Sequence, residues 1–309
     1  MLDARLGAWL EQVNQRTAES DDPEIAADPA AVRSNLAAMT AQFVSPGPGV
    51  SWVADRVVEA EGQSVDVRLY DPAPQRAKPV LLFFHGGGHM AGSVAVYDPI
   101  CRRLAEASGG LVVSVDYRLA PEHPYPQGLE DCLHVVRHVR ALLESAQRLF
   151  EPRLVLVGDS GGAALAATIS ARAQTDASLA VDAQVLIYPS LDYTLNHRSV
   201  YDNGRGYLLE QARIGWYFDC YFQGQEDRLA VSPLYMPVTP TLAPTLVISA
   251  GYCPLRDEAF AYAQRLAAGG VTCRHRHFAD MIHAYLNLEA LVPEACAQTY
   301  REIGDFLAR

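Results

Sequence analysis

Short, largely apolar runs recur along the chain from residue 79 onward. They read VLLFF at 80–84, LVVSV at 111–115, LVLV at 154–157, QVLIY at 184–188 and TLVIS at 245–249. Each run except the fourth is followed by a stretch that can form a helix. Continuous apolar strands that alternate with helices are typical of a parallel sheet buried on both faces. The pattern therefore predicts an α/β fold, with a mostly parallel central sheet and helices on both faces.

The pattern before residue 79 is different. Apolar residues at helical spacing predict two amphipathic helices, over 2–16 and 32–43. The segment SPGPG at 45–49 separates them from two stretches, 51–60 and 64–70, that have strand character. We therefore expect an N-terminal pair of cap helices, residues 1–45, packed on a catalytic domain, residues 46–309, that begins with an antiparallel pair of strands.

The stretch from about 190 to 225 interrupts the alternation of strands and helices. It is rich in aromatic residues, namely Tyr193, Tyr201, Tyr207, Trp216, Tyr217, Phe218, Tyr221 and Phe222. Its length and aromatic content predict a lid or cap inserted into the sheet domain.

Composition narrows the function classes. Half of the 309 residues are apolar, which excludes a disordered or collagen-like chain. The 25 basic and 36 acidic residues give a formal net charge of −11, which argues against nucleic acid or an anionic membrane as the main partner. The six cysteines form no CxxC pair, and the N-terminus lacks the pattern of a signal peptide. We therefore expect reduced thiols and a cytoplasmic protein.

The strongest signal for chemistry is the sequence GDSGG at 158–162, between an apolar run and a helix-prone stretch. A G-x-S-x-G sequence in this context makes a sharp turn that exposes the serine oxygen, because no side chain fits beside the turn. Ser160 is thus the candidate nucleophile. The alternative is a glycine-rich turn that binds phosphate at a helix N-terminus.

A second glycine cluster, HGGG at 85–88, directly follows the strand predicted at 80–84. Consecutive glycines allow backbone N–H groups to point into a site, where together with the N–H of Gly161 they can bind a developing oxyanion. A dinucleotide-binding turn does not match the spacing of these glycines. A tight loop without chemistry is the simpler alternative.

A serine nucleophile needs a base, and in this fold the chain order is serine, acid, histidine. His283 lies after the last predicted strand, 271–278, and before the C-terminal helix, where this order requires it. His275 and His277 lie on that strand and are expected to pack or to face solvent.

Two further histidines, His134 and His138, share one helical face with Asp131. They could form a metal cluster. An exposed amphipathic face is the preferred interpretation, so that no metal site is predicted.

These motifs, together with VDYRLAPEHPYP at 115–126 and PLRDE at 254–258, resemble the hormone-sensitive-lipase-like branch of the α/β-hydrolases, the bacterial carboxylesterases of family IV. The resemblance covers about residues 50–309, and the N-terminal helices and the 190–225 insert match that family's cap. It implies an α/β-hydrolase fold without a metal or organic cofactor. It also implies roles for nine positions: Ser160 as nucleophile, His283 as general base, Gly87, Gly88 and Gly161 as the oxyanion hole, and Tyr117, Arg118 and Glu122 as structural braces, with Cys253 at the position of the triad acid.

That last position is where the chain departs from the family, whose pattern reads DPLRDE with its first aspartate catalytic. Here Cys253 stands in its place. The sequence predicts a helix from Pro254 to about Ala268, with Cys253 as its N-cap. Three explanations remain open: a thiolate favoured by the helix N-terminus orients His283, Asp257 replaces the missing acid, or the enzyme is impaired, naturally or by an engineered substitution.

We therefore expect a serine carboxylesterase that hydrolyses short-acyl esters through an acyl-enzyme. Its pocket is expected to be compact and apolar, with Tyr188 and Tyr193 among the lining residues. The alternatives are a non-catalytic small-molecule-binding protein on a hydrolase scaffold, as in the plant gibberellin receptors, and an amidase or lactonase. A homodimer is left open, because edge-strand dimers are common in the resembled family.

Overall fold

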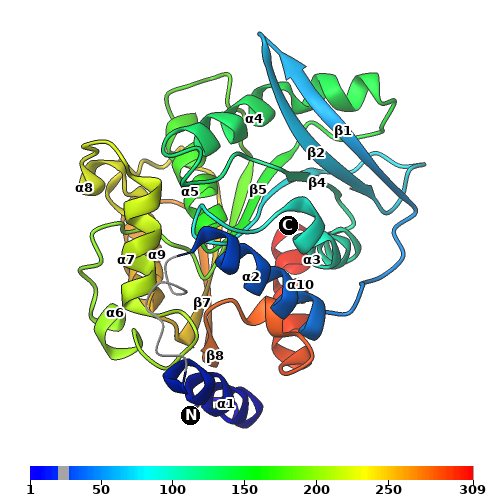
Figure 1. The fold of residues 1–309 in the computed structure, drawn as a ribbon. Helices are drawn as coiled ribbons and strands as arrows, with labels where there is room; N and C mark the ends of the chain where they lie inside the picture. The colour runs from blue at the N-terminus through cyan, green and yellow to red at the C-terminus, as the bar shows by residue number, and fades with distance from the viewer. Residues whose placement is uncertain (20–27, 309) are drawn as a thin grey trace.

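The computed structural model describes residues 1–19 and 28–308, which form an α/β fold around an eight-stranded sheet (Figure 1). The strand order is β1-β2-β4-β3-β5-β6-β7-β8. Neighbouring strands are parallel from β4 to β8, whereas β2 is antiparallel to both β1 and β4. The strands are β1 (Trp52–Ala60), β2 (Gln63–Asp71), β3 (Val80–Phe84), β4 (Leu111–Val115), β5 (Leu154–Asp159), β6 (Ala183–Ile187), β7 (Thr245–Tyr252) and β8 (Cys273–Ile282). The predicted α/β fold and antiparallel pair are confirmed.

Helices cover both faces of this sheet. On one face, α3 (Val94–Ser108) and α10 (Pro293–Leu307) bury apolar residues against the sheet, and on the other face α4 (Gln127–Ser145), α5 (Gly161–Ala173) and α9 (Arg256–Ala268) do so. Alternate residues of each strand enter the two cores: Leu81 and Phe83 of β3 join the first, and Leu82 and Phe84 the second. This is why the strands appear in the sequence as continuous apolar runs.

Five further helices of the described residues lie outside these two layers, and three of them, α1, α2 and α7, line one cavity although they come from distant parts of the chain (Figure 1). The five are α1 (Ala4–Glu19), α2 (Pro29–Phe43), α6 (Arg198–Asp202), α7 (Gln211–Tyr221) and α8 (Arg228–Val231). The side chain of Asn14 on α1 donates a hydrogen bond of 3.0 Å to the carbonyl of Gly206, in the segment before α7. The two predicted N-terminal helices are confirmed, and the helices after β6 continue beyond the predicted 190–225. Over the residues the structure describes, no helix is both long and apolar enough to cross a membrane.

Candidate active site

Ser160 lies at the sharp turn between β5 and α5. Its backbone has φ +53°, a left-handed conformation that costs a non-glycine residue energy. Glycines beside it leave space for the turn: a Cβ added at Gly162 would lie 2.0 Å from the carbonyl oxygen of Phe84, and one at Gly158 would lie 2.4 Å from Gly162. The GDSGG sequence is therefore required by close contact between backbones.

His283 directly follows β8, and an irregularity in the sheet determines its position. Ala250 of β7 is opposite Phe278 of β8, but Tyr252 is opposite Ile282, so that β8 carries two extra residues between the two pairs (282 − 278 = 4 against 252 − 250 = 2). Gly251 lies at this irregularity, where an added Cβ would lie 2.1 Å from the carbonyl oxygen of Ala279. The result is that Nε2 of the buried His283 lies 2.8 Å from Oγ of Ser160.

Cys253 lies on the other side of the His283 ring. Its Sγ is 3.1 Å from Nδ1 of His283 and also accepts a hydrogen bond of 3.3 Å from the N–H of Leu255. The following helix, α9, begins at Arg256, two residues later than predicted, and Leu255 is its N-cap. Cys253 is therefore not the N-cap that the sequence indicated. It directly follows β7, which ends at Tyr252, and contacts the histidine from there.

Burial determines the protonation of this pair. It raises the pKa of the Cys253 thiol, which is 1% exposed, well above its ordinary value. Burial also lowers the pKa of His283 to about 3. Both groups are thus neutral at pH 7. Burial of the thiol therefore argues against the first of the three explanations, in which a thiolate orients His283.

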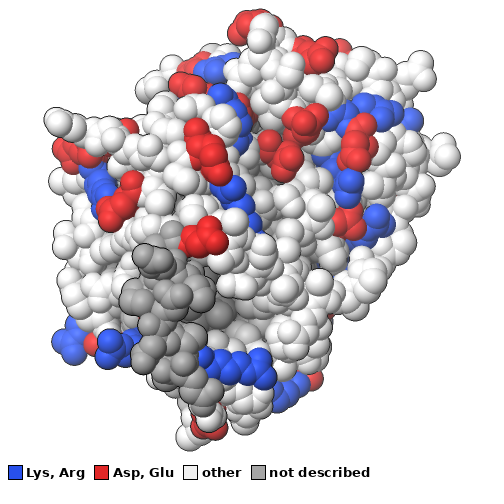
Figure 2. Space-filling model, viewed as in Figure 1, with Lys and Arg blue, Asp and Glu red and all other residues white. Residues whose placement is uncertain are grey.

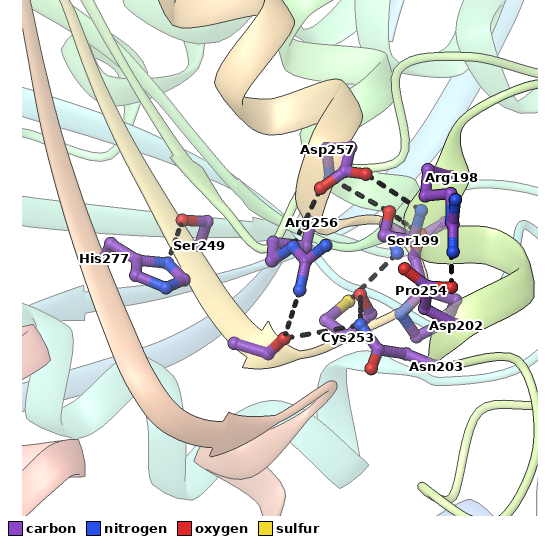
Figure 3. A network of polar contacts seen from close by, with 12 residues as sticks. Arg198, Ser199, Asp202, Asn203, Ser249, Cys253, Pro254, Arg256, Asp257 and His277 are labelled. Atoms are coloured by element: carbon purple, nitrogen blue, oxygen red, sulfur yellow. Dashed lines mark hydrogen bonds and ion pairs between the residues drawn. The ribbon is translucent and has the colours of Figure 1, made fainter. Parts of the chain in front are cut away.

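Asp257 does not replace the missing acid (Figure 3). Its Oδ2 accepts the N–H of Ser199 at 2.8 Å, and its Oδ1 accepts a hydrogen bond of 2.8 Å from Nε of Arg256. Its contacts are thus with α6 and its own helix, and among the described residues none is with His283. Figure 3 also shows Asn203, whose side-chain amide donates to the carbonyl of Cys253 at 3.1 Å and so positions the residue through its backbone.

The glycine loop after β3 lies beside the turn that carries Ser160. Gly87 and Gly88 have φ +120° and +63°, and Gly161 comes within 3.5 Å of Gly88 when a Cβ is added to it. The N–H groups of these three glycines make no hydrogen bond to another described residue, and all three line the same cavity as Ser160. The structure thus places together the residues predicted from two separate motifs.

Asp159 connects the two glycine-rich motifs, a role that the sequence analysis missed. Its Oδ1 accepts the N–H of Gly86 at 2.7 Å, and its Oδ2 accepts the hydroxyl of Tyr97 at 3.3 Å. Burial raises the pKa of Asp159 to about 7, although these hydrogen bonds oppose the shift. Its place at the end of a buried strand, beside the nucleophile, is the signal that could have drawn attention to it.

A cavity of about 510 Å³ opens above Ser160 and His283. Its walls come mainly from α1, α2 and α7, and the apolar lining includes Trp9, Leu36, Met39, Phe43, Ile214 and Phe218. The predicted lining residues Tyr188 and Tyr193 are not among them. Tyr188 packs edge-on against the ring of His283, with centroids 4.9 Å apart, and the Tyr193 hydroxyl lies 3.3 Å from Nε2 of His89. Both tyrosines are buried, and each contacts a histidine of the site on the side away from the cavity.

The segment predicted to brace the site does so through three separate contacts. The Tyr117 hydroxyl donates to the carbonyl of His85 at 2.6 Å, Arg118 pairs with Asp131 at 2.7 Å, and Glu122 pairs with Arg33 at 2.6 Å. These positions lie outside the lining of the cavity. Arg33 belongs to α2, so the last pair joins a cap helix to the main domain.

Arg33 also donates to the carbonyl oxygens of Met90 and Ala120, both at 2.9 Å. Met90 follows the glycine loop by two residues. The sequence analysis did not identify Arg33, because its partners are 57 and 87 residues away in the chain.

The other histidines have structural contacts. Ser249 Oγ lies 2.8 Å from Nε2 of His275 and 2.9 Å from Nδ1 of His277, and both rings pack edge-on against Phe260. His134 and Asp131 are buried against the first two strands, where Nε2 of His134 is 3.3 Å from the carbonyl of Val58. This corrects the prediction of an exposed face.

Within residues 1–19 and 28–308, no group of three His, Cys, Asp or Glu side chains is placed to hold a metal ion.

Fold and site together define a class of protein. A serine at a strand-to-helix turn, a histidine after the last strand and a glycine loop after the third strand are the features of an α/β-hydrolase. Comparison with known proteins agrees. The profile of the family described as "alpha/beta hydrolase fold" matches residues 81–287, and the chain belongs to this family, within its hormone-sensitive-lipase-like branch.

Relatives of known name share most of the chain. An ethyl acetate hydrolase of Pseudomonas putida is 35% identical over 243 residues, which is 76% of this chain and 76% of that protein. Carboxylic ester hydrolase LipN of Mycobacterium tuberculosis is 32% identical over 286 residues, 90% of this chain and 74% of that protein. The structure of a hyperthermophilic esterase from Pyrobaculum calidifontis superimposes with a TM-score of 0.86 at 31% identity, covering 100% of this chain and 99% of that one.

Proposed function

We propose that this protein is a serine carboxylesterase that hydrolyses short-acyl esters through an acyl-enzyme. The observation that carries the proposal is the contact of 2.8 Å between Oγ of Ser160 and Nε2 of His283 at the base of a cavity of about 510 Å³. The esterase names of the relatives support it, since the chain covers most of their length.

In the first half of the reaction, Oγ of Ser160 attacks the ester carbonyl while Nε2 of His283 takes its proton. The N–H groups of Gly87, Gly88 and Gly161 stabilise the oxyanion, and its collapse expels the alkoxide, which receives the proton from His283. Water then attacks the acyl-serine through the same groups. The carboxylic acid leaves, and Ser160 regains its proton.

The imidazolium formed in each half has the Cys253 thiol beside it instead of a carboxylate. A neutral thiol stabilises this charge poorly, so we propose a slow esterase, in line with the third explanation for Cys253. In serine proteases, replacement of the triad aspartate by a neutral asparagine lowers kcat by about 10⁴.

The same cysteine favours a second candidate, a protein that binds a small molecule without turnover. Hydrolysis of 4-nitrophenyl acetate and butyrate by the wild type, Ser160→Ala and Cys253→Asp distinguishes the two. An esterase gives turnover in the wild type or in Cys253→Asp and none in Ser160→Ala. No turnover in either of the first two, with the fold retained by circular dichroism, would overturn the esterase proposal and leave the binding protein as the remaining candidate. A parallel series of amides and lactones separates esterase from amidase or lactonase activity.

A further inference from the structure

Two cations lie in the wall of the cavity above Ser160. Arg213 of α7 is half-buried and Arg16 of α1 is exposed, and both line the cavity. Among the described residues of the lining, the one acidic residue is Asp159, which is 2% exposed and whose two oxygens already accept hydrogen bonds from Gly86 and Tyr97. The described part of the wall thus carries two cations and one buried acid, in a chain with a formal net charge of −11.

These arginines differ from most cations of the molecule. On the face shown in Figure 2, basic and acidic side chains lie next to each other over much of the surface. Examples are Arg228 with Asp219 at 2.7 Å and Arg33 with Glu122 at 2.6 Å. Among the side chains described, those of residues 1–16 and 28–308, no carboxylate forms an ion pair with Arg213 or Arg16.

The position of Arg213 relates it to the reacting atoms. Tyr217 lies one turn further along α7, and the positive charge of Arg213 acts on its hydroxyl. The Tyr217 ring in turn covers Gly88, because a Cβ added there would lie 2.4 Å from the ring. Arg213 is thus joined to the oxyanion loop through a single aromatic side chain. A guanidinium has five N–H donors in a planar fork, so Arg213 keeps donors for a ligand after this contact.

The chemistry of this wall suits a carboxylate. Charge-assisted hydrogen bonds to a guanidinium are about twice as strong as neutral ones, and they strengthen where surrounding apolar side chains exclude water. The rest of the lining supplies that surrounding, with Phe43, Ile214 and Phe218 among others.

We propose that the cavity selects esters that carry a carboxylate on the part remote from the scissile bond, held by Arg213 and Arg16. The proposal rests on the esterase function given above and names its substrate class. The carboxylate can belong to the acyl part, as in a half-ester of a dicarboxylic acid, or to the alcohol part. Both share the anionic group that the arginines recognise.

Binding to Ser160→Ala, measured by titration calorimetry at low salt, tests the proposal without turnover. Two pairs of esters differ only in a carboxylate against a methyl ketone of similar shape. Monoethyl glutarate against ethyl 5-oxohexanoate examines the acyl side, and 4-acetoxybutanoate against 5-acetoxypentan-2-one examines the alcohol side. We expect the carboxylate of at least one pair to bind about fivefold to twentyfold more tightly. That pair identifies the side on which the anion lies.

Variants then assign the preference to these residues. Arg213→Gln and Arg16→Gln, introduced into Ser160→Ala, are expected to remove the preference for the carboxylate. They should leave the Kd of the neutral ester within about twofold. Arg137→Gln on the distant α4 removes one positive charge, as each single arginine variant does; it is the matched control for each of them and retains the preference. Equal Kd values within both pairs, or a preference that survives in the arginine variants, would overturn the proposal. An absence of turnover in both the wild type and Cys253→Asp would instead count against the esterase function, since these binding constants do not depend on turnover.

Discussion

The sulfur of Cys253 lies 3.1 Å from Nδ1 of His283, while the oxygen of Ser160 lies 2.8 Å from Nε2 of the same ring. A general base at Nε2 requires the proton of the neutral imidazole to be on Nδ1. A carboxylate enforces this tautomer, because it only accepts hydrogen bonds. A thiol can also donate, and its sulfur already accepts from Leu255. The tautomer with Nε2 protonated, which cannot receive the proton of Ser160, is therefore accessible in this protein.

Replacement of Cys253 by aspartate supplies the acceptor that is missing. We expect Cys253→Asp to raise kcat for 4-nitrophenyl butyrate by about 10² to 10⁴, in proportion to the effect of the acid in serine proteases. Cys253→Ser is the matched control, since it keeps a neutral group that both donates and accepts, and its kcat should stay near that of the wild type. A fall in kcat for Cys253→Asp would show that the thiol is a working part of the site.

The same variant changes the pH dependence of the reaction. Burial lowers the pKa of His283 to about 3, so the base form of the histidine persists in the wild type down to about pH 4. A carboxylate at residue 253 stabilises the imidazolium and raises this pKa. The acid limb of the kcat/KM profile is therefore expected to lie at a higher pH in Cys253→Asp. Identical acid limbs in the two proteins would contradict a neutral thiol beside the histidine.

Substitution of Asp257 is expected to change stability and to leave the rate nearly unchanged. Its carboxylate bonds to Ser199 and Arg256, so we expect Asp257→Asn to leave kcat within about twofold and to lower the free energy of unfolding by about 1 kcal/mol. Esterase kinetics and urea unfolding of the same preparation measure the two effects. A loss of turnover without loss of stability would indicate that Asp257 acts as the acid that orients His283.

Asp159 makes stability depend on pH. Its pKa rises from the ordinary value of 3.8 to about 7 on folding, so the folded protein holds a proton that the unfolded chain has lost between these values. The free energy of unfolding therefore decreases as the pH rises through this range, by about 1.4 kcal/mol per pH unit from this group. Asp159→Asn removes the contribution.

Urea unfolding from pH 4.5 to 8 measures this contribution of Asp159. It is the difference in the free energy of unfolding between the wild type and Asp159→Asn, in which the effects of other titrating groups cancel. The wild type is expected to lose stability relative to Asp159→Asn over this range. A constant difference would mean that the carboxyl is ionised throughout.

Loss of the Arg33 side chain is expected to lower the free energy of unfolding by more than loss of its ion pair with Glu122 does. Glu122→Gln removes the charge of a half-exposed partner and should cost less than about 1 kcal/mol. Arg33→Met also deprives the carbonyl oxygens of Met90 and Ala120 of a donor and should cost about 2 kcal/mol. Because α2 lines the cavity, KM should rise in Arg33→Met and stay unchanged in Glu122→Gln. Equal effects of the two variants would reduce the role of Arg33 to the ion pair.

The residues that the structure brings together as the sequence predicted are those whose position depends on local backbone geometry. Ser160 and Gly162 were evident because a sharp turn between a strand and a helix admits few residue types, and the apolar runs were evident because each strand is buried on both faces. His283 could be chosen from nine histidines by its place in the chain order.

The residues that the sequence did not identify act across long separations. Arg33 reaches carbonyl oxygens 57 and 87 residues away, and the cavity joins α1 to α7. The tyrosines at 188 and 193 were expected in the pocket because they follow a strand, but their side chains turn to the back of the site. The protonation of Cys253 depends on the depth of its burial, which no local pattern contains.

The two extra residues of β8 opposite β7 set the direction in which His283 points. The proposed reaction therefore depends on the number of residues in this segment as well as on their identity. Successive residues of a strand point to opposite faces, so a deletion of one residue between Phe278 and Ile282 would carry every later side chain to the other face. The histidine would still be present in such a protein, but it would point away from Ser160. Spacing in this segment is thus under the same constraint as the identity of the catalytic residues.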